Sequence, residues 1–394
     1  MRKTIITYVA LCMIGILSVE AQNDYSSVLK EIETNNIELQ ALRTELQAQQ
    51  IENSAANNLE NLSVEGSYSW GNQPMMGNKK TLSVAQPFDF PTVYAMRGKL
   101  MKMTNSNLEL HYSAERLNVL LEAKKLCVEI TYYNSLIQLY DQRLDAAKTI
   151  ADNYNKKMEA GKANILEVNK AELNLASLQS EHDKAVTERQ NLIVALEAMN
   201  GGKAVVVNNV GYEKVSLPND FETWYKEVEN KNPVLLHAQG LVDVNKQQLK
   251  LTKNQWLPQL HVGYVNETVV DESFQGVAVG LSLPLWNNSS KVKQSKAQLL
   301  TSETMLNGTR NECYNTYKTL YNQSLTLQQN ADKLAATLLR CNSEALLQKA
   351  LDAGEISLLE YLLEIEFYQQ AAINTLVAQR DAQMALAELF AMDL

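Results

Sequence analysis

Four short stretches of the chain alternate apolar and polar residues, and they come in two pairs. In the first pair Leu62, Val64 and Tyr68 alternate with Ser63 and Glu65, and the same period of two recurs in the second pair. This period predicts strands with one apolar face. We expect them at about residues 62–70, 80–88, 258–268 and 275–285. Their lengths approach the ~9–11 residues with which a tilted strand crosses a bilayer.

Outside these pairs, apolar residues recur three and four positions apart over long distances. The run from Val168 to Met199 keeps this spacing, interrupted only by His182 and Arg189, and the run after Leu358 repeats it. Heptad spacing of this kind predicts helices that pack along their length. Each strand pair is followed by a helical stretch of about sixty residues, or roughly 90 Å. Extended antiparallel coiled coils fit that length better than a compact domain does.

The two halves of the chain repeat this order of elements at an offset of about 196 residues, so that Tyr68 corresponds to Tyr264. We divide the chain into residues 22–210 as a first repeat and 211–394 as a second. Pro87 and Pro284 occupy corresponding positions at the end of the second strand in each pair. A residue without a backbone N–H is expected at such a strand end.

Glycine interrupts the long helical pattern once in each repeat. Gly161 is followed three residues later by Asn164, and Gly354 is followed three residues later by Ser357. Glycine commonly follows the end of a helix, and asparagine and serine commonly begin one. Each repeat is therefore expected to end in two helices joined by a tight turn.

The first 21 residues have the pattern of a secretory signal peptide, with Arg2 and Lys3, an apolar run, and Ala21 at a small-residue cleavage position. A membrane anchor is the alternative, but the apolar run is shorter than the ~20 residues of a spanning helix. The sequence after residue 21 contains no apolar run of about 18 residues. We therefore expect strands to make any membrane contact.

Composition excludes some classes of function. The chain has 394 residues, 45% of them hydrophobic, a net charge of −9 and scattered basic residues, so it should fold and should not bind nucleic acid. No nucleotide-binding or nucleophile motif occurs, so we expect neither an enzyme nor a cofactor. The four histidines lack metal-ligand spacing, and we interpret each as isolated, with no metal site. Cys127, Cys313 and Cys341 lie in helical stretches and are interpreted as buried thiols.

The signal peptide, the twofold repeat and the motif Gly-x-x-[Asn/Ser]-[Ile/Leu]-Leu-Glu after each long helix resemble the TolC-like outer-membrane efflux proteins. Four strands cannot close a membrane barrel, since the smallest have about eight. The resemblance implies a mainly α fold with a membrane β-barrel portion. Three chains would share one twelve-stranded barrel, and long helices would continue it through the periplasm.

The same resemblance implies a passive exit duct in the outer membrane, which serves a periplasmic adaptor protein and an inner-membrane pump. The turns at Gly161, Lys162, Gly354 and Glu355 would then lie at the helix tips that face the adaptor. A periplasmic coiled-coil adaptor or scaffold without a barrel is the alternative function.

Glu167 and Glu360 follow the two tip glycines by six positions, where the family has an acidic residue near the periplasmic entrance. A ring of such carboxylates would attract cations and could respond to pH. The alternative is that each is an ordinary solvated residue in the first turn of a helix. Sequence alone leaves the two interpretations equal.

Overall fold

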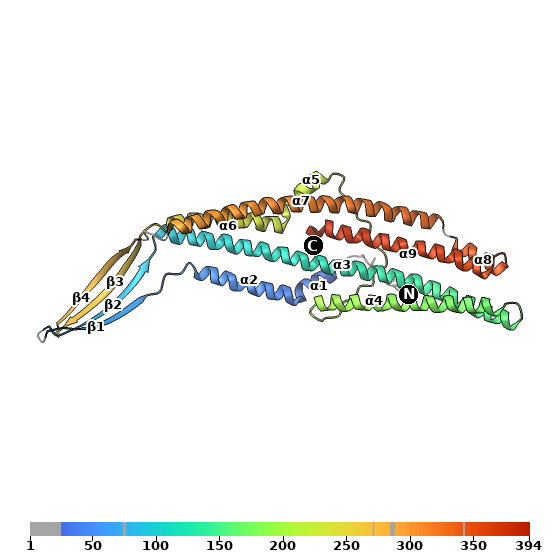
Figure 1. Cartoon of the computed structure of the whole chain (residues 1–394), viewed down its shortest axis with the longest axis horizontal. Helices are drawn as coiled ribbons and strands as arrows, with labels where there is room; N and C mark the ends of the chain where they lie inside the picture. The colour runs from blue at the N-terminus through green and yellow to red at the C-terminus, as the bar shows by residue number, and fades with distance from the viewer. Residues whose placement is uncertain (1–24, 74–75, 271, 284–287, 342) are drawn as a thin grey trace, which may run out of the picture.

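The computed structural model of the chain is an elongated molecule with all its strands at one end and helices along the rest (Figure 1). It describes residues 25–73, 76–270, 272–283, 288–341 and 343–394. The predicted signal peptide, residues 1–21, lies outside the described residues.

The elements of the first half run in the order helix, helix, strand, strand, long helix, helix. They are α1 (Ser26–Asn35), α2 (Ile37–Ala55), β1 (Ser63–Trp70), β2 (Asn78–Phe88), α3 (Pro91–Glu159) and α4 (Ile165–Met199). The second half has the same order with one more helix: α5 (Phe221–Lys231), α6 (Pro233–Asn254), β3 (Gln259–Val269), β4 (Glu272–Ser282), α7 (Asn288–Arg340), α8 (Glu344–Ala353) and α9 (Leu358–Leu389), followed by a short 3₁₀ turn, Ala391–Asp393. The predicted mainly helical fold with strand hairpins is confirmed.

The second long helix differs from the prediction of one continuous helix. Whereas α3 is unbroken over 69 residues, its counterpart stops at Arg340 and resumes as α8 at Glu344. Cys341 therefore lies just beyond the end of α7 and is exposed, while Cys313 is partly buried and Cys127 is buried. The interpretation of all three cysteines as buried thiols holds only for Cys127.

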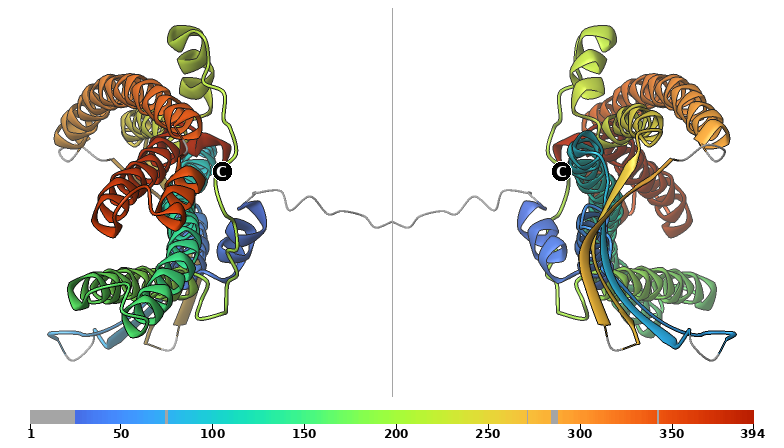
Figure 2. Two further views of the ribbon diagram at one scale, coloured as in Figure 1. Left: turned by 90° about the vertical axis from the view of Figure 1, so that its right-hand side faces the viewer. Right: turned by 90° about the vertical axis from the view of Figure 1, so that its left-hand side faces the viewer.

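The four strands form one antiparallel sheet in the order β1-β2-β3-β4. The two hairpins, one from each half of the chain, join where β2 pairs with β3, for example Val84 with Tyr264. Figure 2 shows the strands side by side, curving away from the helices. Within one chain the sheet is open and does not close into a barrel.

The helices pack in antiparallel pairs, α3 with α4 and α7 with α9 (Figure 1). The heptad seam predicted on α4 is buried at Val168, Ala171, Leu178 and Leu196. The two polar interruptions of this seam bond across it to α3. His182 lies 3.2 Å from the Asp141 carboxylate, and the Arg189 guanidinium donates to the Asn134 side chain. These polar pairs are built into the coiled coil.

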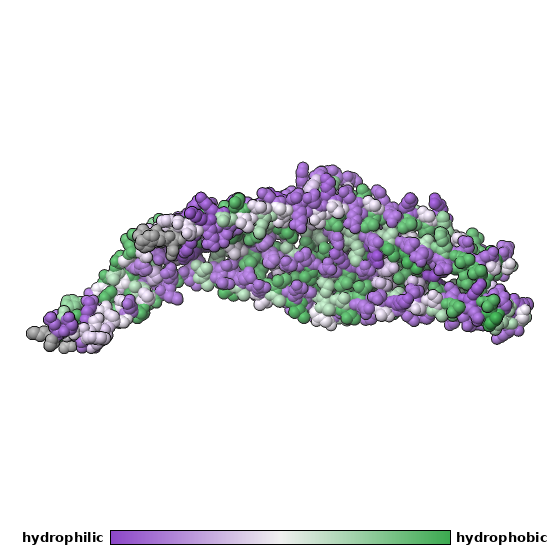
Figure 3. Space-filling model, in the orientation of Figure 1, coloured by the Kyte–Doolittle hydropathy of each residue, from purple (hydrophilic) through white to green (hydrophobic). Residues whose placement is uncertain are grey.

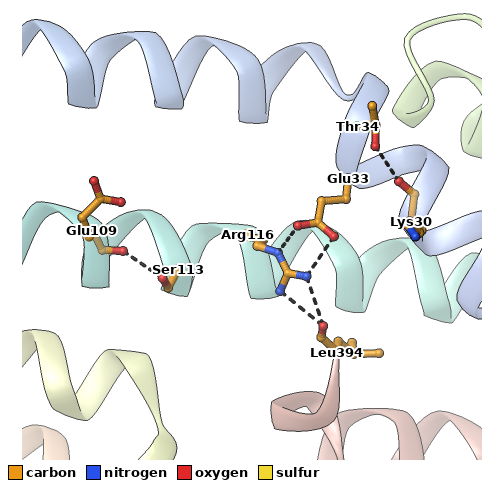
Figure 4. Close-up of polar contacts among 7 residues, drawn as sticks. All are labelled: Lys30, Glu33, Thr34, Glu109, Ser113, Arg116 and Leu394. Atoms are coloured by element: carbon orange, nitrogen blue, oxygen red, sulfur yellow. Dashed lines mark hydrogen bonds and ion pairs between the residues drawn. The ribbon is translucent and has the colours of Figure 1, made fainter.

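The first helix and Leu394 meet on α3 near the middle of the molecule. Arg116 of α3 donates from Nε and Nη2 to the two carboxylate oxygens of Glu33 on α1, at 2.6 and 2.9 Å (Figure 4). The same guanidinium donates to the Leu394 carbonyl oxygen at 3.2 and 3.3 Å. The Arg116 side chain thus joins α1 and Leu394, the residue after the 3₁₀ turn, to α3.

Candidate functional site

The strand register brings the apolar positions of all four strands onto one face of the sheet. Residues directly opposite each other on antiparallel strands point to the same side. Three successive rows across the strands are accordingly apolar apart from one glutamine: Val64, Val84, Tyr264 and Val277; Gln86, Val262 and Val279; Phe88, Leu260 and Leu281. The apolar positions predicted for each strand separately therefore form one continuous surface, here called the apolar band.

This band is exposed in the isolated chain. Val277, Val279 and Leu281 of β4 are 78%, 69% and 67% exposed, and Val64 of β1 is 64% exposed. Figure 3 shows hydrophobic residues along one edge of the sheet, next to more polar ones near its end. Contiguous exposed apolar surface of this kind marks a partner or a membrane.

The opposite face of the sheet, here called the polar face, has most of its charged and hydroxyl side chains, although Val265, Val269 and Phe274 also lie on it. Serines 63, 67 and 69 and Glu65 of β1 lie on it with Thr81 of β2, and Lys79 bridges to Glu267 at 2.5 Å. His261 shares this face. One side of the sheet is therefore suited to lipid and the other to water.

Both edges of the sheet have unpaired backbone groups. Among the described residues, β1 pairs only with β2 and β4 pairs only with β3. Every residue of β1 and β4 is exposed, whereas most residues of β2 and β3 are half-covered. In lipid such edges would leave N–H and C=O groups without partners, which costs several kcal/mol for each group, so they require further strands.

The structure places Pro87 next to last in β2, opposite His261 of β3, because β2 continues to Phe88. Between the end of β2 and the start of α3, Asp89 forms a 2.5 Å ion pair with Arg97 of α3 and accepts a hydrogen bond from Gln259 of β3. Pro284 lies outside the described residues.

The helix tips at the other end of the molecule are tight glycine turns. Gly161 and Gly354 have φ of 69° and 73°, in the left-handed region that favours glycine. After each glycine a backbone N–H bonds back to the preceding helix, from Lys162 to the Lys157 carbonyl at 2.7 Å and from Glu355 to the Ala350 carbonyl at 2.9 Å. These bonds satisfy carbonyls that the helix end would otherwise leave without partners.

Glu167 and Glu360 are the third residues of the helices that follow, and both complete capping boxes. The Glu167 carboxylate accepts from the Asn164 backbone N–H at 2.9 Å, and the Glu360 carboxylate accepts from the Ser357 backbone N–H at 2.8 Å. The Glu360 pKa is lowered, chiefly by this hydrogen bond. Glu360 is exposed and Glu167 is partly exposed, and both lie in the first turn of a helix, which gives each one a structural role.

A single cluster of buried residues joins the two tips. It contains Tyr154, Val168 and Ala171 from the first repeat and Leu351, Leu358 and Tyr361 from the second. The structure therefore brings both predicted turns to the same end of the molecule (Figure 1). Lys162 and Glu355 are exposed on these turns.

Sequence reasoning missed Arg143 of α3, which lies between the two repeats not far from the tips. Its Nε is buried without a hydrogen-bond partner among the described residues, and its guanidinium lies 5.4 Å from the Tyr140 ring centre. Burial lowers the Arg143 pKa against the opposing effect of Glu344 and Glu366 on α8 and α9. This electrostatic effect joins residues about 200 positions apart in the sequence, which no local pattern reveals.

Comparison with known proteins gives a family and a fold. Residues 28–202 match the family model described as "Outer membrane efflux protein". This part of the chain, a little under half of it, is similar to that family. The matched residues span the first repeat, and the fold of the whole chain is similar to that of several solved outer-membrane channels. A search of curated proteins found no match.

Three solved structures illustrate the likeness. The first is a membrane protein from Pseudomonas aeruginosa (TM-score 0.76, 15% identity, 93% of this chain and 92% of that chain). The second is the outer membrane channel CmeC of Campylobacter jejuni (TM-score 0.73, 16% identity, 94% of this chain and 85% of that chain). The third is the outer membrane channel MtrE of Neisseria gonorrhoeae (TM-score 0.73, 14% identity, 93% of this chain and 88% of that chain). At these identities the likeness concerns the fold.

The family match and the fold together support an outer-membrane exit duct of an efflux system, with its helices in the periplasm. No helix among the described residues is both long enough and apolar enough to span a bilayer.

Proposed function

We propose that three copies of this chain close one shared barrel and form a passive exit duct for an inner-membrane pump. The observation that carries the proposal is the apolar band, continuous over four strands that end in two open edges. Three such sheets give twelve strands, more than the ~8 needed for a membrane barrel. The band would face lipid, and the polar face with Lys79, Glu267 and His261 would face the lumen.

The exposed tips support a second part of the proposal, which is that a periplasmic adaptor docks there. Ile165 and Leu166 at the first tip are 56% and 67% exposed, and Leu359 and Leu363 at the second are 47% and 59% exposed. Apolar side chains beside exposed polar turns provide the mixed surface that a helical partner can cover. The duct itself supplies no energy, so transport would depend on the pump that this adaptor recruits.

Cross-linking between edge strands tests the shared barrel. One cysteine on β1, at Glu65, is combined with one on β4, at Gly276, Ala278 or Gly280, after the native cysteines are changed to serine. We expect oxidation in the membrane to produce species of two and three chains for at least one pair. A control pair at Val84 and Tyr264, which are opposite each other within the chain, should cross-link only internally. Purely monomeric products from every edge pair would contradict the proposal.

The gate role of Glu167 and Glu360 is a separate proposal, because their capping boxes already explain why glutamate stands there. Glu360→Gln keeps a side chain that can cap but removes the charge. We expect reconstituted channels of this variant to lose part of their cation preference, with unchanged helix content. Unaltered conductance and ion selectivity would leave these glutamates with the structural role alone.

A further inference from the structure

Two of the four histidines, distant in sequence, meet between the repeats. His111 of α3 and His237 of α6 have ring centroids 5.2 Å apart, with ring planes inclined by 31°. His111 is exposed and His237 is partly exposed, so solvent reaches the pair. The interpretation of each histidine as isolated is wrong for these two.

A close approach of α3 and α6 brings the pair together. Gly240 lies on α6 one turn after His237, and a Cβ built there would fall 2.1 Å from the Asn107 side-chain oxygen. Asn107 lies on α3 one turn before His111 and is 5% exposed. Because glycine leaves room for this side chain, the helix backbones pack closely and the two imidazole rings lie near one another.

A backbone contact fixes the protonation of one ring. Nδ1 of His237 lies 3.1 Å from the Asn107 carbonyl oxygen, which can only accept, so Nδ1 carries the proton. In the neutral imidazole Nε2 then has a free lone pair. A hydrogen bond from one ring nitrogen to a carbonyl, with the other nitrogen available, is the usual arrangement of a metal-binding histidine.

The spacing of the rings suits one shared ion. With a metal–nitrogen distance of about 2.1 Å and about 1.1 Å from nitrogen to ring centre, two rings at a tetrahedral angle have centres about 5.2 Å apart. We propose that His111 and His237 bind one divalent transition-metal ion that joins α3 of the first repeat to α6 of the second.

The chemistry of the pair limits which ions it can hold. Imidazole favours Cu²⁺, Ni²⁺ and Zn²⁺ over Mg²⁺ and Ca²⁺, which prefer oxygen. No third His, Cys, Asp or Glu joins the pair in the part of the chain that the structure describes, so water completes the coordination. The site is therefore of moderate affinity and exchanges its ion with solvent. Both ligands come from one chain, so the site does not depend on how many copies form the duct.

Copper binding tests the proposal, because Cu²⁺ binds nitrogen sites most tightly among these ions. The full-length protein in detergent is titrated with Cu²⁺ alone and followed by electron paramagnetic resonance. We expect one ion per chain with hyperfine coupling to imidazole nitrogen. His111→Asn and His237→Asn should each weaken Cu²⁺ binding at least about tenfold. Losing only the hydrogen-bond partner of a metal ligand already costs about that much affinity, and these variants lose the ligand itself.

Two further variants separate the site from general effects. His261→Asn, on the polar face of the sheet, should leave Cu²⁺ affinity unchanged. Gly240→Ala keeps both imidazoles but should weaken binding, because the added methyl group displaces Asn107 and separates the helices. Zn²⁺ should raise the Tm of the parent protein and not that of the His111→Asn variant. Copper affinity that survives both histidine substitutions would overturn the proposal and leave the pair as stacked rings.

Discussion

Large apolar side chains are buried in the helical part of this molecule and exposed in its sheet. In the coiled coils Leu196 and Leu358 are 0% and 2% exposed, whereas on the outer strand of the sheet Val277 and Val279 are 78% and 69% exposed. Burying such side chains stabilises a fold in water by about 1.5–3 kcal/mol each. The coiled coils gain this stabilisation within one chain, whereas the sheet can gain it only from a partner or from lipid. Exposure of the same kind of residue thus distinguishes the part of the molecule that is packed within one chain from the part that we propose faces lipid.

The largest expected effect comes from emptying a buried position at the tip. Leu358→Ala should lower the free energy of unfolding of the helical part by about 2–5 kcal/mol, because a cavity opens in the cluster that joins both repeats. Denaturant titration in detergent, followed by the circular dichroism of the helices, measures the loss. Leu359→Ala is the matched control. The Leu359 side chain is 47% exposed, so its removal should change the free energy of unfolding by less than ~0.5 kcal/mol. Equal losses in the two variants would show that the tip is not packed as described.

In the sheet, the sensitive positions should be exposed ones, on the apolar band. Val279→Arg places a charge on the apolar band and should cost about 2–4 kcal/mol of insertion free energy near the middle of the bilayer. We expect the variant to be lost from the outer-membrane fraction. Ala278→Arg, one residue away on the polar face, should still insert. If both variants insert equally well, the apolar band does not face lipid.

The smallest expected effect concerns pH at the contact between Arg116 and Glu33. The hydrogen bond from Arg116 lowers the Glu33 pKa, so the folded state favours the carboxylate. The resulting stabilisation is present above the unfolded pKa of about 4.3 and is lost as the pH falls through the lower folded pKa. The two side chains are 28% and 38% exposed, so solvent screening keeps it below about 1 kcal/mol.

Glu33→Gln should therefore lower the Tm slightly at pH 7 and not below pH ~3, where the parent and variant converge. Glu31→Gln, at an exposed position on the same helix, should match the parent at every pH. If the Tm of Glu33→Gln stays below that of the parent by the same amount in acid, the packing of this side chain, and not its charge, stabilises the contact with Arg116.

The features that sequence predicts well are those that local chemistry dictates. The apolar faces of the strands and the glycine turns with Asn164 and Ser357 follow from side-chain periodicity and capping. Strand ends were less accurate: β4 begins at Glu272 and not near 275, because its polar residues still pair with β3 after the alternation has faded. The break after Arg340 escaped prediction, since the sequence there has neither proline nor glycine.

Contacts between the repeats could not be predicted from the sequence. His111 and His237 are 126 positions apart and meet only because Gly240 packs against Asn107. Likewise, the capping role of Glu167 is evident from its spacing, while its distance from a lumen depends on neighbouring chains. Such relations depend on the path of the whole chain, which periodicity does not encode.

The mass of the mature protein in detergent tests the shared barrel most directly. Light scattering, corrected for bound detergent, should give three copies of the chain, because one open sheet cannot close by itself. Val279→Arg protein recovered from inclusion bodies should fail to reach that mass. A parent protein that is monomeric and stays in solution without detergent would contradict the account and favour a coiled-coil scaffold.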